Sequence, residues 1–254
     1  MHIDTHAHLQ FKSFKKDRVQ VIERAASQGV SVIVTVGINM GSSEQALKLS
    51  LEHGGIYGAL GFHPHNAGEM APGDLAALEA MARNEKVVAV GELGLDYHYH
   101  FSPPEVQAEV FREQLRLAHR VKKPLVIHSR EASEETLAIL REEKAEERGG
   151  VIHCFSDTME YARRFLEMGF YLGFTGMIAY GNAGELRKVV AAVPEDRIVA
   201  ETDCPYLDPS RGKRNEPSSI PLIVGKIAEL RGKAPDEMAS ILRRNAMSLF
   251  SLKL

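Results

Sequence analysis

The sequence predicts an α/β protein of the (β/α)8 or TIM-barrel class, and three observations lead to this prediction. The chain has 254 residues, which is the usual size of one such barrel. Eight short apolar runs rich in β-branched residues alternate with longer amphipathic segments, as repeated βαβ units require. Most of these runs are continuously apolar, which is typical of parallel strands buried on both faces. An open doubly wound sheet is the rival architecture, and the chain length and the count of eight favour the closed barrel.

The predicted elements alternate along the whole chain. Strands are expected over 1–6, 30–37, 56–63, 87–93, 124–129, 149–155, 170–175 and 197–203. Helices are expected over 17–28, 42–52, 72–83, 103–121, 131–147, 183–192, 220–231 and 236–250, with a further one opened by Asp157 and closed by Gly169. The segment 103–121 has the clearest helical pattern, and Ser102 and Glu105 match a capping box around Pro103.

Composition limits the classes of protein that the chain can represent. No linker or break in composition divides it, so residues 1–254 are expected to form one domain. The net charge of −3 comes without a long basic run, so any polyanion would have to be held locally. We expect a cytoplasmic protein with no membrane contact, because a signal peptide and a long apolar run are both missing. No obligate protein partner is evident.

Imidazole and carboxyl groups recur at the C-terminal ends of the predicted strands, where the active sites of such barrels lie. These groups are costly inside apolar runs unless something satisfies them. One buried histidine is usually a packing residue, but a whole set at one end of a barrel favours a functional site. Six side chains are predicted to be metal ligands: His6, His8, Glu92, His128, His153 and Asp203.

The number and chemistry of these groups predict a two-metal site. His6 and His8 are two residues apart, so on an extended strand they face the same way. Six protein ligands exceed what one tetrahedral zinc ion takes, and they suit two divalent ions about 4 Å apart with Glu92 as a carboxylate bridge. Imidazole and carboxylate together fit magnesium, manganese, iron or zinc, so the identity of the metal stays open.

Several neighbouring polar residues have two possible roles. His63 is expected to contact substrate or to orient a ligand, and His65 to contact substrate or to lie on the surface. Arg130 has the same strand parity as His128 and suits either an anionic substrate or a structural salt bridge. Glu201 could orient the site, and Asp96 could cap the loop after its strand.

Two loops that are neighbours in a closed barrel carry basic residues. Either they form a solvated rim, or they hold the phosphates of an extended substrate. The residues are Lys12, Lys15, Lys16, Arg211, Lys213 and Arg214. Cys154 and Cys204 each follow a predicted ligand, so strand alternation predicts that both thiols point away from the site.

Seven motifs together resemble the TatD-type deoxyribonucleases, a family of amidohydrolase-like barrels. They are DTHAH (4–8), GFHPH (61–65), GELGLDY (91–97), PLVIHSR (124–130), HCFS (153–156), ETDCPYL (201–207) and RGKRNEP (211–217). The resemblance implies that the six residues named above are the ligands. It also implies magnesium-dependent cleavage of DNA, often from the 3′ end. Glu92 stands where related amidohydrolases use a modified lysine, which argues against an enzyme that cuts C–N bonds.

The hypothesis is therefore two-metal hydrolysis of a phosphodiester. Glu92 would bridge the ions, Asp203 would accept the proton of the attacking water, and His63 would position the scissile phosphate. One rival is a hydrolase of the same fold acting on a phosphotriester, a lactone or an aminoacyl-tRNA ester, because one fold hosts many reactions. The other rival is a non-catalytic binding barrel.

Overall fold

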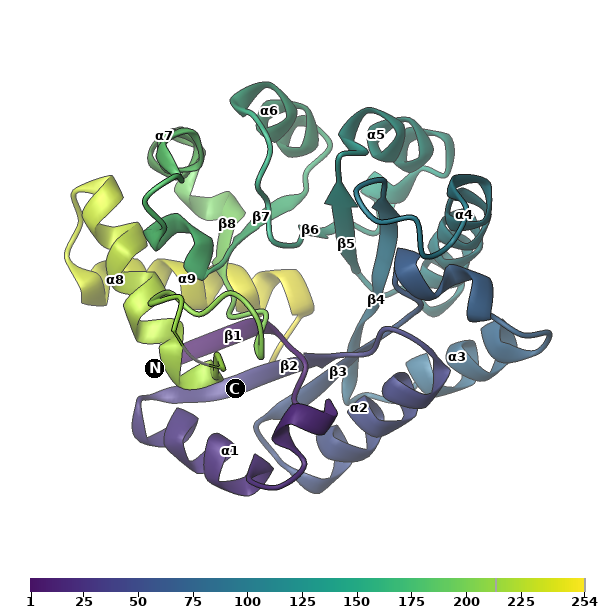
Figure 1. Ribbon diagram of the computed structural model, residues 1–254, viewed down its shortest axis with the longest axis horizontal. Coiled ribbons are helices and arrows are strands. Elements are labelled where there is room, and N and C mark those ends of the chain that lie inside the picture. The colour runs from purple at the N-terminus through teal and green to yellow at the C-terminus, as the bar shows by residue number, and fades with distance from the viewer. Residues whose placement is uncertain (213, 254) are drawn as a thin grey trace.

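The computed structural model describes residues 1–212 and 214–253, and at its centre eight parallel strands form a ring (Figure 1). They pair in chain order. The ring closes beyond β8, where Ala7 pairs with Cys204 and the His8 N–H donates to the Cys204 carbonyl at 2.8 Å. The predicted (β/α)8 class is therefore confirmed. The strands are β1 (His2–Ala7), β2 (Val30–Val36), β3 (Ile56–Leu60), β4 (Val87–Asp96), β5 (Leu125–Arg130), β6 (Gly150–Ile152), β7 (Tyr171–Phe174) and β8 (Ile198–Ala200).

Nine α-helices within the described residues surround the strands, and all nine lie close to their predicted ranges. Their apolar faces pack on the outside of the barrel around large buried side chains such as Phe111 and Phe165. The helices are α1 (Arg18–Ser27), α2 (Met40–Glu52), α3 (Asp74–Ala82), α4 (Pro104–Val121), α5 (Ser133–Glu142), α6 (Met159–Glu167), α7 (Gly184–Ala192), α8 (Ile220–Arg231) and α9 (Pro235–Phe250). Short 3-10 turns cover 12–14, 64–69, 145–147, 176–179, 195–197 and 217–219.

A second apolar cluster fills the inside of the barrel with small, mostly β-branched side chains, among them Val32, Val34 and Val126. Leu249 and Phe250 of α9 belong to the same cluster. The amide of Asn245 in α9 also donates to the carbonyl of Ile198, at the start of β8. Because α9 closes this N-terminal end, the polar ends of the strands are left at the opposite mouth.

Three predicted strands extend too far at their C-terminal ends. β3 ends at Leu60, β6 at Ile152 and β8 at Ala200, so His63, His153 and Asp203 lie in the connecting loops. Cys154 and Asp203 have φ angles of +47° and +52°, a left-handed conformation that interrupts a strand. The chain therefore turns at these points, and the side chains that follow the strands are aimed by loop geometry.

Two predicted helix starts were wrong in detail. Ser102 does not cap α4; its hydroxyl donates to the His65 carbonyl and accepts from the Gly68 N–H, both at 3.0 Å. This contact ties the loop after β3 to the start of α4. Helix α6 is capped by the Thr158 hydroxyl, while the Asp157 carboxylate accepts from Ser133 at 2.5 Å.

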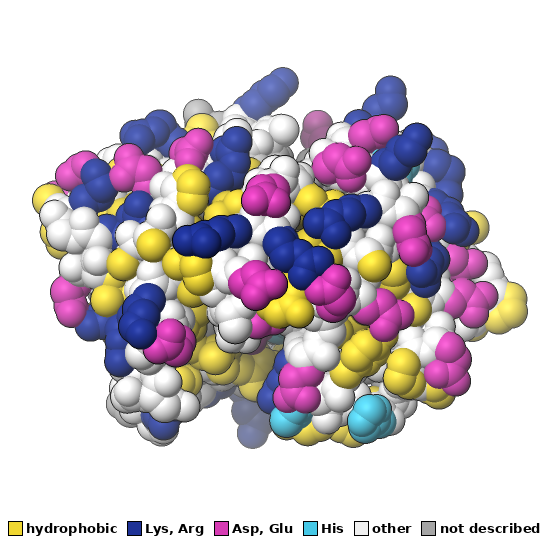
Figure 2. Space-filling view, turned by 90° about the horizontal axis from the view of Figure 1, so that it is seen from above, with side chains coloured by type: hydrophobic (Ala, Val, Ile, Leu, Met, Phe, Trp, Pro, Cys, Tyr) yellow, Lys and Arg dark blue, Asp and Glu magenta, His cyan; other side chains and the backbone are white. Residues whose placement is uncertain are grey.

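The outer surface carries mixed charge. Figure 2 views the molecule from the side of α6 and shows Lys and Arg side chains interspersed with Asp and Glu. Mixed charge of this kind creates no extended field of one sign on that face. Among the described residues, no helix combines the length and the apolar character that crossing a bilayer demands.

Candidate metal centre

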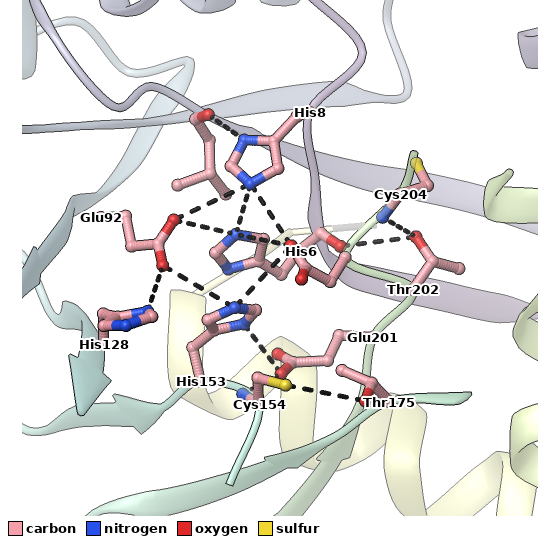
Figure 3. Close-up of polar contacts among 12 residues, drawn as sticks. His6, His8, Glu92, His128, His153, Cys154, Thr175, Glu201, Thr202 and Cys204 are labelled. Atoms are coloured by element: carbon pink, nitrogen blue, oxygen red, sulfur yellow. Dashed lines mark hydrogen bonds and ion pairs between the residues drawn. The ribbon is translucent and has the colours of Figure 1, made fainter. Parts of the chain in front are cut away.

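A pocket of about 750 Å³ opens at the mouth of the barrel. Five of the six predicted ligands line it, and His6 lies fully buried beneath them. Figure 3 shows that the labelled imidazoles come from β1 and the residue after it, from β5 and from the loop after β6, and that they converge on Glu92. The structure thus brings together residues that are far apart in the sequence.

One group of ligand atoms surrounds the first histidine pair. The Nε2 atoms of His6 and His8 lie 3.2 Å apart. Asp203 Oδ1 lies 3.3 Å from His8 Nε2 and 3.8 Å from His6 Nε2, and Glu92 Oε2 lies 3.5 Å from His6 Nε2. These nitrogen and oxygen atoms lie too close together, and carry too few protons, for every pair to form a hydrogen bond. Such a cluster is suited to binding a cation.

A second group surrounds the other oxygen of the same carboxylate. Glu92 Oε1 lies 3.0 Å from His128 Nδ1, 3.5 Å from His63 Nε2 and 3.8 Å from His153 Nε2. His153 Nε2 is also 3.8 Å from Asp203 Oδ1, so this ring stands between the two groups. The two oxygens of Glu92 therefore face two different sets of ligands.

Each of three imidazoles has a partner on the side away from the centre. His8 Nδ1 lies 2.8 Å from the Val36 carbonyl, and His128 Nε2 lies 2.9 Å from Asp96 Oδ2. His153 Nδ1 lies 2.9 Å from Glu201 Oε1. Such partners orient each ring so that its other nitrogen faces the site.

The carboxylate of Glu201 is fully buried, and a nearby glycine without a side chain leaves the space for it. A Cβ at Gly173 would lie 2.5 Å from the Glu201 carboxylate oxygens, so no larger residue fits there. Glu201 Oε1 also accepts from the Cys154 N–H at 2.5 Å. The side chain thus orients both the His153 ring and the turn that carries it, as its predicted role requires.

We expect Glu201→Gln to weaken divalent-metal binding by about tenfold. Glutamine keeps the shape and a carbonyl oxygen for the Cys154 N–H, but it removes the negative charge that makes His153 a stronger ligand. Competition of the purified protein with a fluorescent chelator measures the change. Glu195→Gln, a half-exposed position, serves as the control, and equal affinity in both variants would contradict the role of Glu201.

Asp96 caps the loop after its strand, as expected from the sequence, and it also contacts two imidazoles, which was not predicted. Its Oδ1 accepts from the N–H groups of His98 and Tyr99 at 3.0 and 2.9 Å, which caps the loop after β4. Its Oδ2 contacts His128 Nε2 and lies 3.0 Å from His65 Nε2. Burial alone would raise the pKa of Asp96. The hydrogen bonds from the imidazoles outweigh burial and hold that pKa well below its usual range.

A further buried carboxylate, which was not predicted from the sequence, lies beneath the predicted ligands. Asp4 accepts from the Thr202 hydroxyl at 2.6 Å and from the Thr202 N–H at 2.9 Å. This pair joins β1 to the chain after β8 just below His6. Burial raises the pKa of Asp4 to about 7 in spite of these bonds. Its place in the DTHAH motif is therefore structural.

The charges of the ligands complement one another. Burial alone would raise the pKa of Glu92, but the surrounding imidazoles outweigh it and hold that pKa well below the usual range. The same balance lowers the pKa of Asp203. For His153, the nearby carboxylates overcome burial and raise the pKa to about 10. Both carboxylates are therefore ionised, which is the form in which a carboxylate can bind a metal ion.

The prediction for Cys154 was wrong. Its side chain lines the pocket, and its sulfur lies within 4.8 Å of ligand atoms of His153 and Asp203. Strand alternation does not apply, because Cys154 follows the end of β6 and has a positive φ. Burial raises the pKa of its thiol well above the usual range. Cys204 is buried, as expected.

The predicted substrate-binding residues fall into two sets. His63, His65 and Arg130 line the pocket. Arg214 pairs instead with Asp17 and Glu216, at 2.6 and 2.8 Å. Arg211 donates to Asn182 and lies over the ring of Tyr180, while Lys213 falls outside the described residues. For these last three residues, substrate contact stays a prediction from sequence.

The aromatic side chains of the pocket were also not predicted from the sequence. Phe11, Tyr99 and Tyr206 line it and lie in the loops after β1, β4 and β8. A polar residue in an apolar run is costly to bury and therefore suggests a functional site, whereas an aromatic residue there is usually assigned to the hydrophobic core. The rule that barrel sites are built from these loops would have identified all three.

Comparison with known proteins agrees with this geometry. A model of the family described as TatD related DNase matches residues 3–251. The chain belongs to the TatD family. YabD of Bacillus subtilis, named a metal-dependent hydrolase, is 45% identical and aligns over 99% of this chain and all of its own. The 3'-5' ssDNA/RNA exonuclease TatD of Erwinia tasmaniensis is 38% identical over 98% of this chain and 99% of its own.

Solved structures of the TatD family share the same fold. The crystal structure of YJJV, a TatD homologue from Escherichia coli, is 33% identical to this chain. It superposes with a TM-score of 0.94 and covers 99% of this chain and 98% of its own. The expected barrel, the expected family and the expected class of enzyme, a metal-dependent hydrolase, are thereby confirmed.

Proposed function

We propose that this protein hydrolyses phosphodiester bonds of DNA, removing nucleotides from a 3′ end, with two divalent cations held at the barrel mouth. The single observation that carries the proposal is the carboxylate of Glu92, whose two oxygens face two separate sets of ligand atoms. A carboxylate that bridges two ions is typical of enzymes that displace groups at phosphorus. The name of the Erwinia tasmaniensis relative supports the same bond and the same direction.

The residues present fit such ions. Ligand atoms of His6, His8 and Asp203 lie within 4.8 Å of one another, and so do those of His63, Glu92 and His128. Both sets combine imidazole nitrogen with carboxylate oxygen, which suits magnesium, manganese or zinc. We assign His153 to the second ion together with Glu92 and His128, because its Nε2 faces Glu92 Oε1.

The bound cations supply charge that lowers the pKa of water and neutralises the phosphoryl oxygens. The protein side chains do the rest. Asp203 keeps some exposure to the pocket, with 15% of its side chain accessible, and accepts the proton of the attacking water. His63, whose pKa is held well below the usual range by burial, is neutral and places the phosphate by hydrogen bonding.

DNA is the proposed substrate, and the pocket offers it both polar and aromatic contacts. Arg130 lies at the mouth, where a guanidinium can hold a phosphate of the strand. We place all of this machinery in one domain spanning residues 1–254, acting in the cytoplasm. A same-fold hydrolase of another ester and a non-catalytic barrel are the alternatives. The carboxylates of the candidate metal centre and the relatives named as hydrolases argue against the non-catalytic barrel.

Digestion of end-labelled oligonucleotides tests the function. With magnesium, manganese or zinc added after chelation, a 5′-labelled single strand should yield a ladder that shortens from the 3′ end. A 3′-labelled strand should release its label at once as a mononucleotide. The same reactions with a phosphotriester, a lactone and an aminoacyl-tRNA serve as controls. Metal-stimulated hydrolysis of one of those esters without cleavage of DNA or RNA would refute the proposal.

A further inference from the structure

The exposed aromatic side chains of this protein gather at the mouth of the metal pocket. Across residues 1–212 and 214–253, seven large hydrophobic side chains are strongly exposed, and three of them are aromatic. These three are Tyr99, Phe101 and Tyr206, with exposed fractions of 43%, 70% and 56%. Tyr99 and Tyr206 line the pocket. Because exposed apolar area is unfavourable in water, its concentration beside the centre indicates a surface for a ligand.

Two of these rings form one exposed stacked pair, which we call the aromatic ledge. Tyr99 and Phe101 stack with their centroids 5.5 Å apart and their planes inclined by 26°. His65 contacts both rings in T-shaped geometry, with centroid distances of 5.6 Å to Tyr99 and 4.9 Å to Phe101. His65 is itself held by Asp96. The ledge is thus fixed to the same carboxylate that orients His128.

A cation accompanies the ledge. The guanidinium of Arg130 lies 5.0 Å from the centre of the Tyr99 ring. Within the described part of the chain, no carboxylate lies at ion-pair distance from Arg130, in contrast to Arg214 with its two acidic partners. A flat aromatic surface next to an unneutralised guanidinium is the arrangement that binds a base and its phosphate together.

The opposite rim has a smaller aromatic surface. Phe11 stacks on the ring of His8, with centroids 4.5 Å apart and planes at 8°. Tyr206 meets the edge of Phe11 at 6.4 Å and is more than half exposed. The metal ligands therefore lie between two aromatic surfaces, one on each side of the pocket.

We propose that the aromatic ledge stacks on unpaired nucleobases of the substrate strand and that Arg130 binds the phosphate that links them. Tyr206 stacks on the base on the other side of the scissile bond. This inference rests on the proposed function and assigns its base contacts to named residues. Stacking tolerates any base, because every base has a π face. A base in a duplex has both faces covered by its neighbours, so the two surfaces favour a frayed or single-stranded end.

Replacement of the ledge rings tests the inference. Tyr99→Leu and Phe101→Leu keep apolar bulk but remove the π face, and Tyr99→Phe retains it. Leu222→Ala, at a side chain that is 67% exposed and away from the pocket, is the matched control. Binding of a fluorescein-labelled oligothymidylate is followed by anisotropy in EDTA, and cleavage is followed with metal. Both are repeated with a strand of the same length whose nucleotides lack bases.

Each leucine variant should weaken binding of oligothymidylate about tenfold and raise KM by a similar factor, with kcat within about twofold. Leu222→Ala should behave as wild type, and Tyr99→Phe should restore most of the affinity that Tyr99→Leu loses. On the strand without bases, the difference between wild type and the leucine variants should vanish.

Two results would separate failure of this inference from failure of the proposed function. If wild type cleaves DNA but the leucine variants bind it as tightly, the ledge does not stack bases and the inference is overturned. If binding depends on the ring and the base while no strand is cleaved, the ledge assignment stands and the nuclease proposal falls. Equal loss on strands with and without bases would show a general apolar surface and would also overturn the inference.

Discussion

Glu92→Ala should reduce hydrolysis of a DNA strand by about 1,000-fold or more while the barrel still folds. The carboxylate contributes one oxygen to each of the two ligand sets, so its loss disrupts both. Charge stabilisation by bound metal amounts to several kcal/mol, and about 4 kcal/mol corresponds to that factor in rate. Initial rates at saturating metal and substrate measure the effect.

A second substitution separates a chemical defect from a folding defect. Glu92→Gln keeps the volume of the side chain and should also be severely impaired, because an amide is a poor bridge between cations. Glu185→Gln, at a side chain that is 86% exposed on α7, is the matched control for loss of one negative charge. Far-UV circular dichroism should be unchanged in all three variants. A rate within tenfold of wild type for Glu92→Ala would contradict the bridging role.

Metal binding should stabilise the fold strongly. After chelation, saturation of one site with magnesium, manganese or zinc at about 100 times its Kd should raise the free energy of unfolding by about 2.7 kcal/mol. For a chain of this size, that corresponds to an increase in Tm of about 5–10 °C. The gain arises because a cation relieves crowding among buried nitrogen and oxygen atoms that only partly satisfy one another. Differential scanning calorimetry measures the change.

The stoichiometry of the same samples tests the two-ion arrangement. Elemental analysis after gel filtration should find two metal ions per wild-type chain and fewer in Glu92→Ala. The control Glu185→Gln should bind as many as wild type. One ion per wild-type chain under saturating conditions, with full activity, would exclude a two-metal mechanism. An unchanged Tm on loading would show that the pocket is not a metal site at all.

The residues of the centre could be identified from sequence because their signal is local. A histidine or carboxyl group at the end of an apolar run is expensive to bury, and the run itself shows which end of a barrel strand it occupies. His6 lies on β1 and His8 directly follows its last residue, with the spacing that the pattern requires, and His128 lies on β5. The barrel followed from the alternation of buried strands with amphipathic helices.

Strand ends and cap contacts were less predictable. Apolar residues continue beyond the ends of β3 and β6, at Phe62 and Phe155, so composition does not reveal where the chain turns. Ser102 has the sequence of a helix cap, yet its hydroxyl bonds to His65 and Gly68, which no local pattern indicates. A hydrogen bond to a residue 37 positions away and a local capping bond contribute similar free energies, so tertiary packing decides which of them forms.

The sequence by itself determined the barrel, its family and the set of side chains at its mouth, because periodicity and residue chemistry can be recognised in short stretches of sequence. Tertiary contacts set the rest. Which nitrogen of His128 or His153 faces the centre depends on Asp96 and Glu201, and the inward turn of Cys154 depends on backbone geometry. The two aromatic surfaces exist only because loops after β1, β4 and β8 meet around one pocket, and side-chain direction in a loop is fixed by neighbours that are distant in sequence.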